Sequence, residues 1–260
     1  MAEPDTQDID SFNVNPEHMI HAINNMRRLF LEKKPHIKEY YKIRNMHSEI
    51  VDAMIQYHQN GKFKQKIDKS SVSKSEPVTT VRLLESSFDL TTREGAQGFY
   101  DMMIYKPSSN VNCITEDFIT NNRYKKPEKM EFLRSMLNSK LGLFEVTGTD
   151  LMNGYAYIKD VLTGVEYTII DIGLSGQPNF GDFYFYTRII SYNGINFGTG
   201  LNLIFTKDDK FIKNHIQEHK KDFHPNGEFE RFTQLFNRFS KYPDKIEIVT
   251  NNPAYARARK

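Results

Sequence analysis

The segment that decides the fold runs from Phe144 to Phe205, and its last part, residues 182–205, reads DFYFYTRIISYNGINFGTGLNLIF. Aromatic and β-branched residues alternate here with Gly, Asn and Asp, which is typical of short strands joined by tight turns. Leu162-Thr163-Gly164 and Asn193-Gly194 supply the positive-φ residues that hairpins need. The predicted strands are Phe144–Thr147, Tyr155–Val161, Val165–Asp171, Asp182–Ile190, Ile195–Phe197 and Leu201–Phe205. We therefore expect a small six-stranded antiparallel β barrel or curled sheet, because closure buries the strand edges.

Helical patterns lie before and after this β unit, so the predicted fold class is α+β with segregated helices. Apolar residues recur there at intervals of three and four, as on one face of a helix. The predicted helices cover residues 16–30, 36–59, 92–105, 115–121, 127–141 and 208–223, and a last helix follows Pro225. We expect the C-terminal helices to pack on the β unit.

The chain divides into two predicted domains at a polar, lysine-rich stretch, Lys62–Val78. Residues 1–77 would form a helical hairpin and a basic linker, and residues 78–260 an α+β domain with its β unit at 144–205. We also expect a flexible leader at Met1–Ser11, a short strand or helical turn at Val81–Leu84, and a last strand at Ile246–Val249.

The amino-acid composition limits the class of protein but does not indicate a function. The chain has 260 residues, 38% of them hydrophobic, and a net charge of +2, so it can bury a core and is only mildly basic. Its single cysteine, Cys113, excludes an internal disulfide and a multi-cysteine zinc site. Neither a secretion signal nor an apolar run long enough to span a membrane is present, which predicts a cytoplasmic protein.

Aromatic and basic side chains alternate within two predicted strands. Side chains two positions apart share a strand face, and residues 27–74 add a basic stretch with 12 Lys or Arg against 5 Asp or Glu. Aromatic rings beside cations can stack bases and contact phosphates, so we expect a protein without catalytic activity that binds nucleic acid or a nucleic-acid-associated complex. The predicted binding residues are Tyr155, Tyr157, Lys159, Tyr184, Tyr186, Arg188, Arg27 and Arg28. The alternative is that helices 130–141 and 229–239 cover these tyrosines.

A second hypothesis is an assembly module that docks a protein partner or a second copy of the chain. Phe229, Phe232, Phe236 and Phe239 recur at helical spacing, and the first helix is rich in methionine. Apolar stripes of this kind pack either in the core or against another subunit.

The third hypothesis is a zinc-dependent hydrolase, since residues 215–219 read HIQEH. Two histidines one helical turn apart can hold zinc while Glu218 activates water, but a catalytic zinc needs a third protein ligand. His224, Glu228, Glu230 and Glu247 are candidates between which the sequence does not choose. Because the surrounding residues are polar and lysine-rich, we expect a solvent-facing helix with no metal. We predict no cofactor either, because the chain has no P-loop for a nucleotide. The absence of a G-x-S-x-G motif likewise gives no support to nucleophilic catalysis.

Three segments together resemble a known β module. They are Gly142-Leu143-Phe144-Glu145-Val146, the run Ile158–Gly164, and Gly181-Asp182 leading into a strand that ends Thr187-Arg188-Ile189. This pattern, about a quarter of the chain, resembles a module of uncharacterised bacterial proteins, some of which carry a SEC-C zinc motif. The SEC-C cysteines are absent here. The resemblance implies a bacterial or mobile-element origin and carries no activity or site residues across.

Overall fold

The computed structural model describes residues 16–61, 88, 93–105, 113–177, 180–221 and 227–241. These residues form seven α-helices, one short 3-10 helix and one five-stranded sheet, so the α+β class is confirmed. The helices are α1 (Pro16–Leu31), α2 (Pro35–Gln59), α4 (Arg93–Tyr105), α5 (Ile114–Thr120), α6 (Pro127–Leu137), α7 (Lys210–Lys221) and α8 (Glu228–Lys241). The predicted leader, the linker at Lys62–Val78 and the elements at Val81–Leu84 and Ile246–Val249 lie outside the described residues.

The sheet is antiparallel with strand order β3-β2-β1-β4-β5. Its strands are β1 (Lys140–Asp150), β2 (Tyr155–Asp160), β3 (Glu166–Ile170), β4 (Phe183–Tyr192) and β5 (Ile195–Thr206). The six-stranded prediction is wrong because Gly198-Thr199-Gly200 does not end a strand. β5 runs through these residues, and a register shift between Thr187 and Ile189 of β4 accommodates them.

The sheet is curled but not closed. β3 and β5 form its two edges, yet they approach each other where Asn196 Nδ2 donates to the Thr168 carbonyl at 3.0 Å. The predicted hairpin turn between β4 and β5 is confirmed, since Asn193 and Gly194 have φ values of 49° and 73°. One face of the sheet encloses a small apolar cluster that includes Phe144, Ile158 and Phe185.

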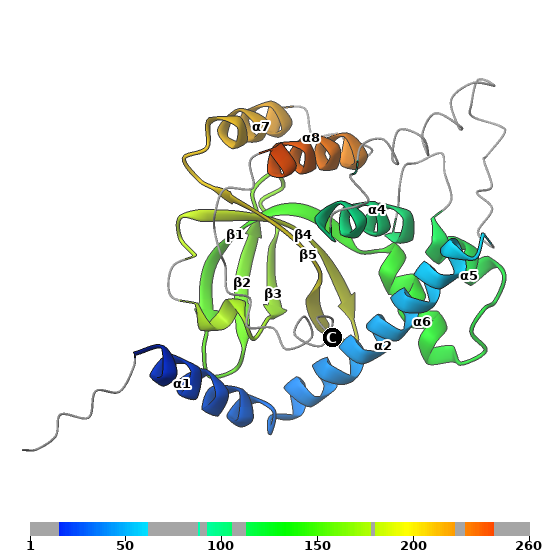
Figure 1. The fold of residues 1–260 in the computed structure, drawn as a ribbon, viewed down its shortest axis with the longest axis horizontal. Coiled ribbons are helices and arrows are strands. Elements are labelled where there is room, and N and C mark those ends of the chain that lie inside the picture. Colours follow the sequence, from blue (N-terminus) through cyan, green and yellow to red (C-terminus); the bar gives the residue numbers. More distant parts are fainter. Residues whose placement is uncertain are drawn as a thin grey trace, which may run out of the picture.

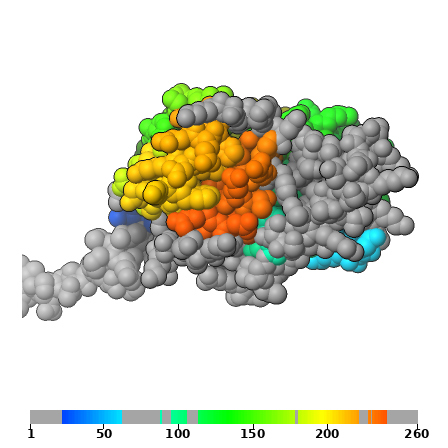
Figure 2. Space-filling model, turned by 90° about the horizontal axis from the view of Figure 1, so that it is seen from above, coloured from blue at the N-terminus to red at the C-terminus, as the bar shows by residue number. Residues whose placement is uncertain are grey.

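Helices cover the other face, which carries the main hydrophobic core. α8 contributes Phe232 and Phe236, both buried, and the Phe232 ring lies 5.9 Å from that of Tyr186 in β4. α6 places Phe132 5.0 Å from Tyr192. Figures 1 and 2 show α7 beside α8 over one end of the sheet. The C-terminal helices thus pack on the sheet, as predicted.

Two helix predictions need correction. The helix expected at 127–141 ends at Leu137, because Lys140 begins β1 and pairs with Ile189. The expected helical hairpin is absent, since Figure 1 shows α1 and α2 diverging from their junction instead of lying side by side. α2 is part of the main core through Ile43, Ile50 and Met54.

None of the helices in the described ranges combines the length and the apolar character that a bilayer crossing requires.

Candidate functional site

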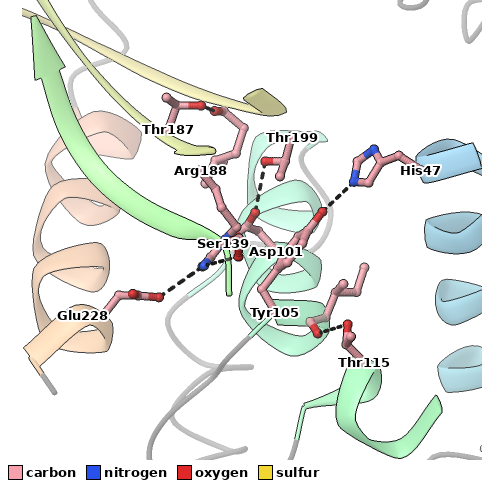
Figure 3. Close-up of polar contacts among 11 residues, drawn as sticks. His47, Asp101, Tyr105, Thr115, Ser139, Thr187, Arg188, Thr199 and Glu228 are labelled. Carbon is pink, nitrogen blue, oxygen red and sulfur yellow. Dashed lines mark hydrogen bonds and ion pairs between the residues drawn. The ribbon is translucent and has the colours of Figure 1, made fainter. Parts of the chain in front are cut away.

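A buried ion-pair cluster surrounds Arg188 of β4, whose side chain is 1% exposed. Its Nε donates to Asp101 Oδ2 of α4 at 2.9 Å, and Nη1 and Nη2 each lie 3.3 Å from Glu228 Oε1 of α8 (Figure 3). The guanidinium carbon lies 4.8 Å from the ring centroid of Tyr105, and Nη1 lies 3.4 Å from Ser139 Oγ. The positive charge is therefore compensated inside the protein, and the cluster joins the sheet to two helices.

The cluster extends to α2 through Tyr105, whose hydroxyl lies 2.6 Å from His47 Nε2 (Figure 3). Burial, with a smaller contribution from the charge of Arg44, lowers the pKa of the His47 imidazole to about 3. Burial and the charge of Asp101 raise the pKa of the Tyr105 hydroxyl. A neutral imidazole and a neutral phenol thus share one buried hydrogen bond, which links α2 to α4.

The prediction that Tyr186 and Arg188 belong to an exposed binding surface is wrong. The two residues share a strand face, as expected, but α4 and α8 cover it, and Tyr186 is only 2% exposed. Neither side chain is available to a nucleic acid. The alternative reading, in which the C-terminal helix covers the tyrosines, holds for Tyr186.

The other predicted binding residues on the strands are more exposed to solvent than Tyr186 and Arg188. Tyr157 is 41% exposed, whereas Tyr155 is half-buried and stacks on His36 with ring centroids 5.1 Å apart. Lys159 and Tyr184 line one open cleft of about 360 Å³, together with Lys220 of α7, Glu145 and the β2–β3 turn. The structure therefore brings together two of the predicted binding residues and adds Lys220, which the strand pattern could not indicate.

Arg27 and Arg28 of α1 have different surroundings. Arg27 donates to the Leu151 carbonyl at 3.0 Å, to the Ile172 carbonyl at 2.8 Å and to Ser175 Oγ at 2.6 Å. Its guanidinium is therefore occupied in holding α1 against the β1–β2 turn and the 3-10 helix η1 (Leu174–Gly176). Burial lowers the pKa of this guanidinium. Arg28 pairs with Glu32 in the next turn at 3.0 Å.

The apolar side of α1 faces solvent. Leu31 is fully buried, but Ile23, Met26, Leu29 and Phe30 are 56%, 63%, 58% and 46% exposed. An amphipathic helix normally turns its apolar face to the core, whereas α1 binds the body of the protein through a polar residue, Arg27. Single exposed apolar residues are common, whereas several on one face form a candidate interaction surface.

The β1–β2 turn, which Arg27 of α1 contacts at the Leu151 carbonyl, carries two more exposed apolar side chains, Leu151 and Met152, at 48% and 56%. The turn is held in place by hydrogen bonds, because Lys34 Nζ donates to Asn153 Oδ1 at 2.6 Å and His36 Nε2 lies 2.9 Å from the Asn153 carbonyl. We name this surface the α1 platform. It comprises Ile23, Met26, Leu29, Phe30, Leu151 and Met152. The methionine-rich first helix was predicted as a docking element, but no sequence pattern indicated that the turn would lie beside it.

The second predicted docking element, the phenylalanine stripe of α8, is largely internal. Phe232 and Phe236 are 0% and 2% exposed, and Phe239 packs against the core beside Phe205. The side chain of Phe229 lies outside the described set. The stripe therefore does not provide a docking surface through Phe232 and Phe236.

His215 and His219 lie together on α7, with ring centroids 4.3 Å apart. His215 is buried, which lowers the pKa of its imidazole to about 4, and His219 Nε2 lies 3.4 Å from Gln234 Oε1. Within the described ranges, no three His, Cys, Asp or Glu side chains cluster closely enough to hold a metal ion. Of the candidate third ligands, Glu228 is bonded to Arg188, while His224 and Glu247 lie outside those ranges.

A comparison with protein families finds that residues 34–247 match a family of unknown function (DUF7986). The chain belongs to this family. No curated protein and no solved structure matches it. The match begins at Lys34, so the sheet and helices from α2 to α8 lie in the matched range, whereas α1 precedes it. The resemblance to the SEC-C-associated module, and the bacterial origin it implies, stay predictions.

Proposed function

We propose that this protein is an assembly module that pairs with a second copy of itself through the α1 platform. The observation that carries the proposal is the outward apolar face of α1, which Arg27 fixes with three hydrogen bonds. A rigid apolar surface loses little conformational entropy on binding, and burying it removes apolar area from water.

The spacing of side chains on α1 favours a second copy as the partner. In an antiparallel pair of α1 helices with a twofold axis at Met26, Met26 meets its own copy and Ile23 meets Leu29. The same symmetry places Phe30 opposite Ala22, so that the large aromatic ring meets the smallest side chain of the face. A twofold interface must be self-complementary in this way.

The charges beside the stripe do not oppose self-pairing. Arg28 is neutralised within its own helix by Glu32, at 3.0 Å. Two copies therefore do not bring uncompensated arginines together, which would otherwise cost association energy.

The test is a cysteine crosslink at the proposed axis. Met26→Cys should form an intermolecular disulfide under mild oxidation, because residues on a twofold axis bring their Cβ atoms within bonding range. The native Cys113 is buried and does not compete. Val165→Cys is the matched control, since Val165 is 48% exposed but lies outside the platform. Equal crosslinking of both variants, or a wild-type monomer at high concentration in sedimentation, would contradict the proposal.

A second candidate function is binding of single-stranded nucleic acid at the cleft near Lys159. Lys159 and Lys220 line it with Tyr184, and the exposed Tyr157 follows on the same face of β2. The Lys159–Glu166 pair is long, at 3.9 Å, and its members are 41% and 72% exposed, so a phosphate could compete for the lysine.

Fluorescence anisotropy with labelled single-stranded DNA and RNA over a salt series tests this candidate. Affinity should fall as salt rises, and the double variant Lys159→Glu, Lys220→Glu should flatten the slope of log K against log salt by roughly 1 to 2. Lys129→Glu is the control, because Lys129 lies on α6 away from the cleft. Absence of binding at low salt would remove the candidate.

A further inference from the structure

Among the described residues, the solvent-accessible sulfur atoms lie on the α1 platform. Cys113 is buried and caps α5, its Sγ accepting from the Glu116 amide at 3.4 Å, and burial raises the pKa of its thiol to about 12. It therefore has little thiolate character at neutral pH and is a poor target for oxidants. The reactive sulfur must be sought among the methionines.

Two methionines stand apart from the others by exposure. Met26 is 63% exposed and Met152 is 56% exposed, and both belong to the α1 platform. The remaining methionines with described side chains are buried or packed against the core; they are Met46, Met54, Met102, Met103, Met130 and Met136. Oxidation of methionine follows solvent access, so among the methionines with described side chains an oxidant reaches those of the platform first.

Hydrogen bonds hold the backbone around Met152. Its amide donates to Asp150 Oδ1 at 3.0 Å, and the preceding residue, Leu151, accepts from Arg27 of α1. Arg27 thus links α1, which carries Met26, to the turn that carries Met152.

We propose that the α1 platform is a peroxide-sensitive switch in which oxidation of Met26 separates the two copies. This inference rests on the proposed self-association. Hydrogen peroxide transfers one oxygen atom to the thioether: the O–O bond breaks, an S–O bond forms, the sulfur loses two electrons and the peroxide leaves as water. The product, methionine sulfoxide, is polar and accepts hydrogen bonds.

The twofold arrangement amplifies the effect of this reaction. Met26 would lie against its own copy at the axis, so oxidation of both chains places two sulfoxides face to face in an apolar interface. Burying such polar groups without partners is unfavourable. We expect the dimer Kd to rise by about 100-fold. Because the dimer covers Met26, the monomer is the form that reacts, and the oxidation rate should fall as protein concentration rises.

The experiment combines peptide mapping with sedimentation. The full chain is treated with hydrogen peroxide until mass spectrometry shows Met26 converted, and its Kd is measured before and after. Conversion should raise Kd, and treatment with methionine sulfoxide reductases should restore it. Met26→Gln, which imitates the polarity of the sulfoxide, should raise Kd without peroxide. For Met26→Leu, the ratio of oxidised to untreated Kd should approach one, whatever its starting Kd.

A matched control lies outside the platform. The double variant Met46→Leu, Met130→Leu should respond to peroxide like the wild type, because these residues pack against the core. An untreated protein that is always monomeric would overturn the proposed function. An untreated dimer that persists after complete oxidation of Met26 would overturn only the switch.

Discussion

Arg188 illustrates how one buried side chain can organise several elements. It is bound by Asp101 and Glu228 from two helices, and both its charge and its hydrogen-bonding groups are satisfied inside the protein. Replacing a member of such a cluster leaves its partner charged and buried, which costs far more than the loss of an exposed ion pair.

Arg188→Met should therefore lower the free energy of unfolding by about 3–5 kcal/mol, since it leaves the Asp101 carboxylate without its partner. Chemical denaturation monitored by circular dichroism measures this loss. The double variant Asp101→Leu, Arg188→Met should recover part of it, because the remaining unpaired carboxylate, Glu228, is 27% exposed and can be hydrated. Lys129→Met, which breaks the exposed pair with Glu49, should cost only about 0–1 kcal/mol. Equal costs for Arg188→Met and Lys129→Met would show that the cluster is not a structural centre.

His47 makes stability depend on pH. Its pKa is about 3 in the folded protein and about 6.5 when unfolded, so it is neutral in both states above pH 6.5. As pH falls from 6.5 to 3, the His47 side chain binds a proton in the unfolded chain but not in the folded protein. The free energy of unfolding therefore falls by on the order of 4 kcal/mol. His47→Gln, which can still bond to Tyr105 but cannot titrate, should reduce this slope in denaturation measured from pH 7 to pH 4. Tyr105→Phe should keep the slope, although it loses the hydrogen bond.

At the residue scale, the sequence predicted which side chains share a face but not what covers that face. Alternation in β4 correctly groups Tyr184, Tyr186 and Arg188. The same pattern is compatible with solvent or with helices above it, because tyrosine and arginine combine apolar stems with polar ends. The deciding partner, Asp101, lies 87 residues away in sequence, and local patterns carry no information about such pairs.

The positions of helices and strands were more predictable than the surroundings of single side chains. The described helices and four of the strands follow from periodicity and turn residues, because these signals are local. The prediction was wrong for β5, because Gly198 and Gly200 are typical of a break between two strands. In the structure both glycines lie within one continuous strand of the curled sheet. The sequence left open whether the apolar face of α1 meets the core or a partner, because periodicity identifies an apolar face but does not say what lies beside it.

The contact between α4 and α8 depends on Gly98. A Cβ at this position would lie 2.6 Å from the ring of Phe236. Although alanine is the better helix former, Gly98→Ala should reduce stability by about 1–3 kcal/mol through overpacking. Gly181→Ala is the control, since a Cβ there meets nothing within 4 Å. Thermal denaturation of both variants checks this prediction, and a stabilised Gly98→Ala protein would contradict the close approach of the two helices.

At the scale of the whole molecule, the family match and the proposed interface occupy different parts of the chain. The matched range, residues 34–247, contains the sheet, the Arg188 cluster and the covering helices, whereas the apolar stripe of α1 precedes it. The β1–β2 turn lies within the range and contributes Leu151 and Met152. Arg27 thus anchors α1, the helix proposed to form the dimer, to residues within the matched range.

Self-association couples the stability of the whole molecule to its concentration. If two folded chains pair and unfolded chains do not, mass action makes the melting temperature rise with protein concentration. Each tenfold increase adds about 1.4 kcal/mol per dimer, which corresponds to a rise of roughly 1–3 °C for a chain of this length. Met26→Glu should abolish the dependence, because the twofold axis brings two carboxylates together. Val165→Glu adds the same charge outside the platform and should retain it. Scanning calorimetry at three concentrations makes the comparison, and a wild-type melting temperature that does not change with concentration would mean that the apolar face of α1 does not pair two folded chains.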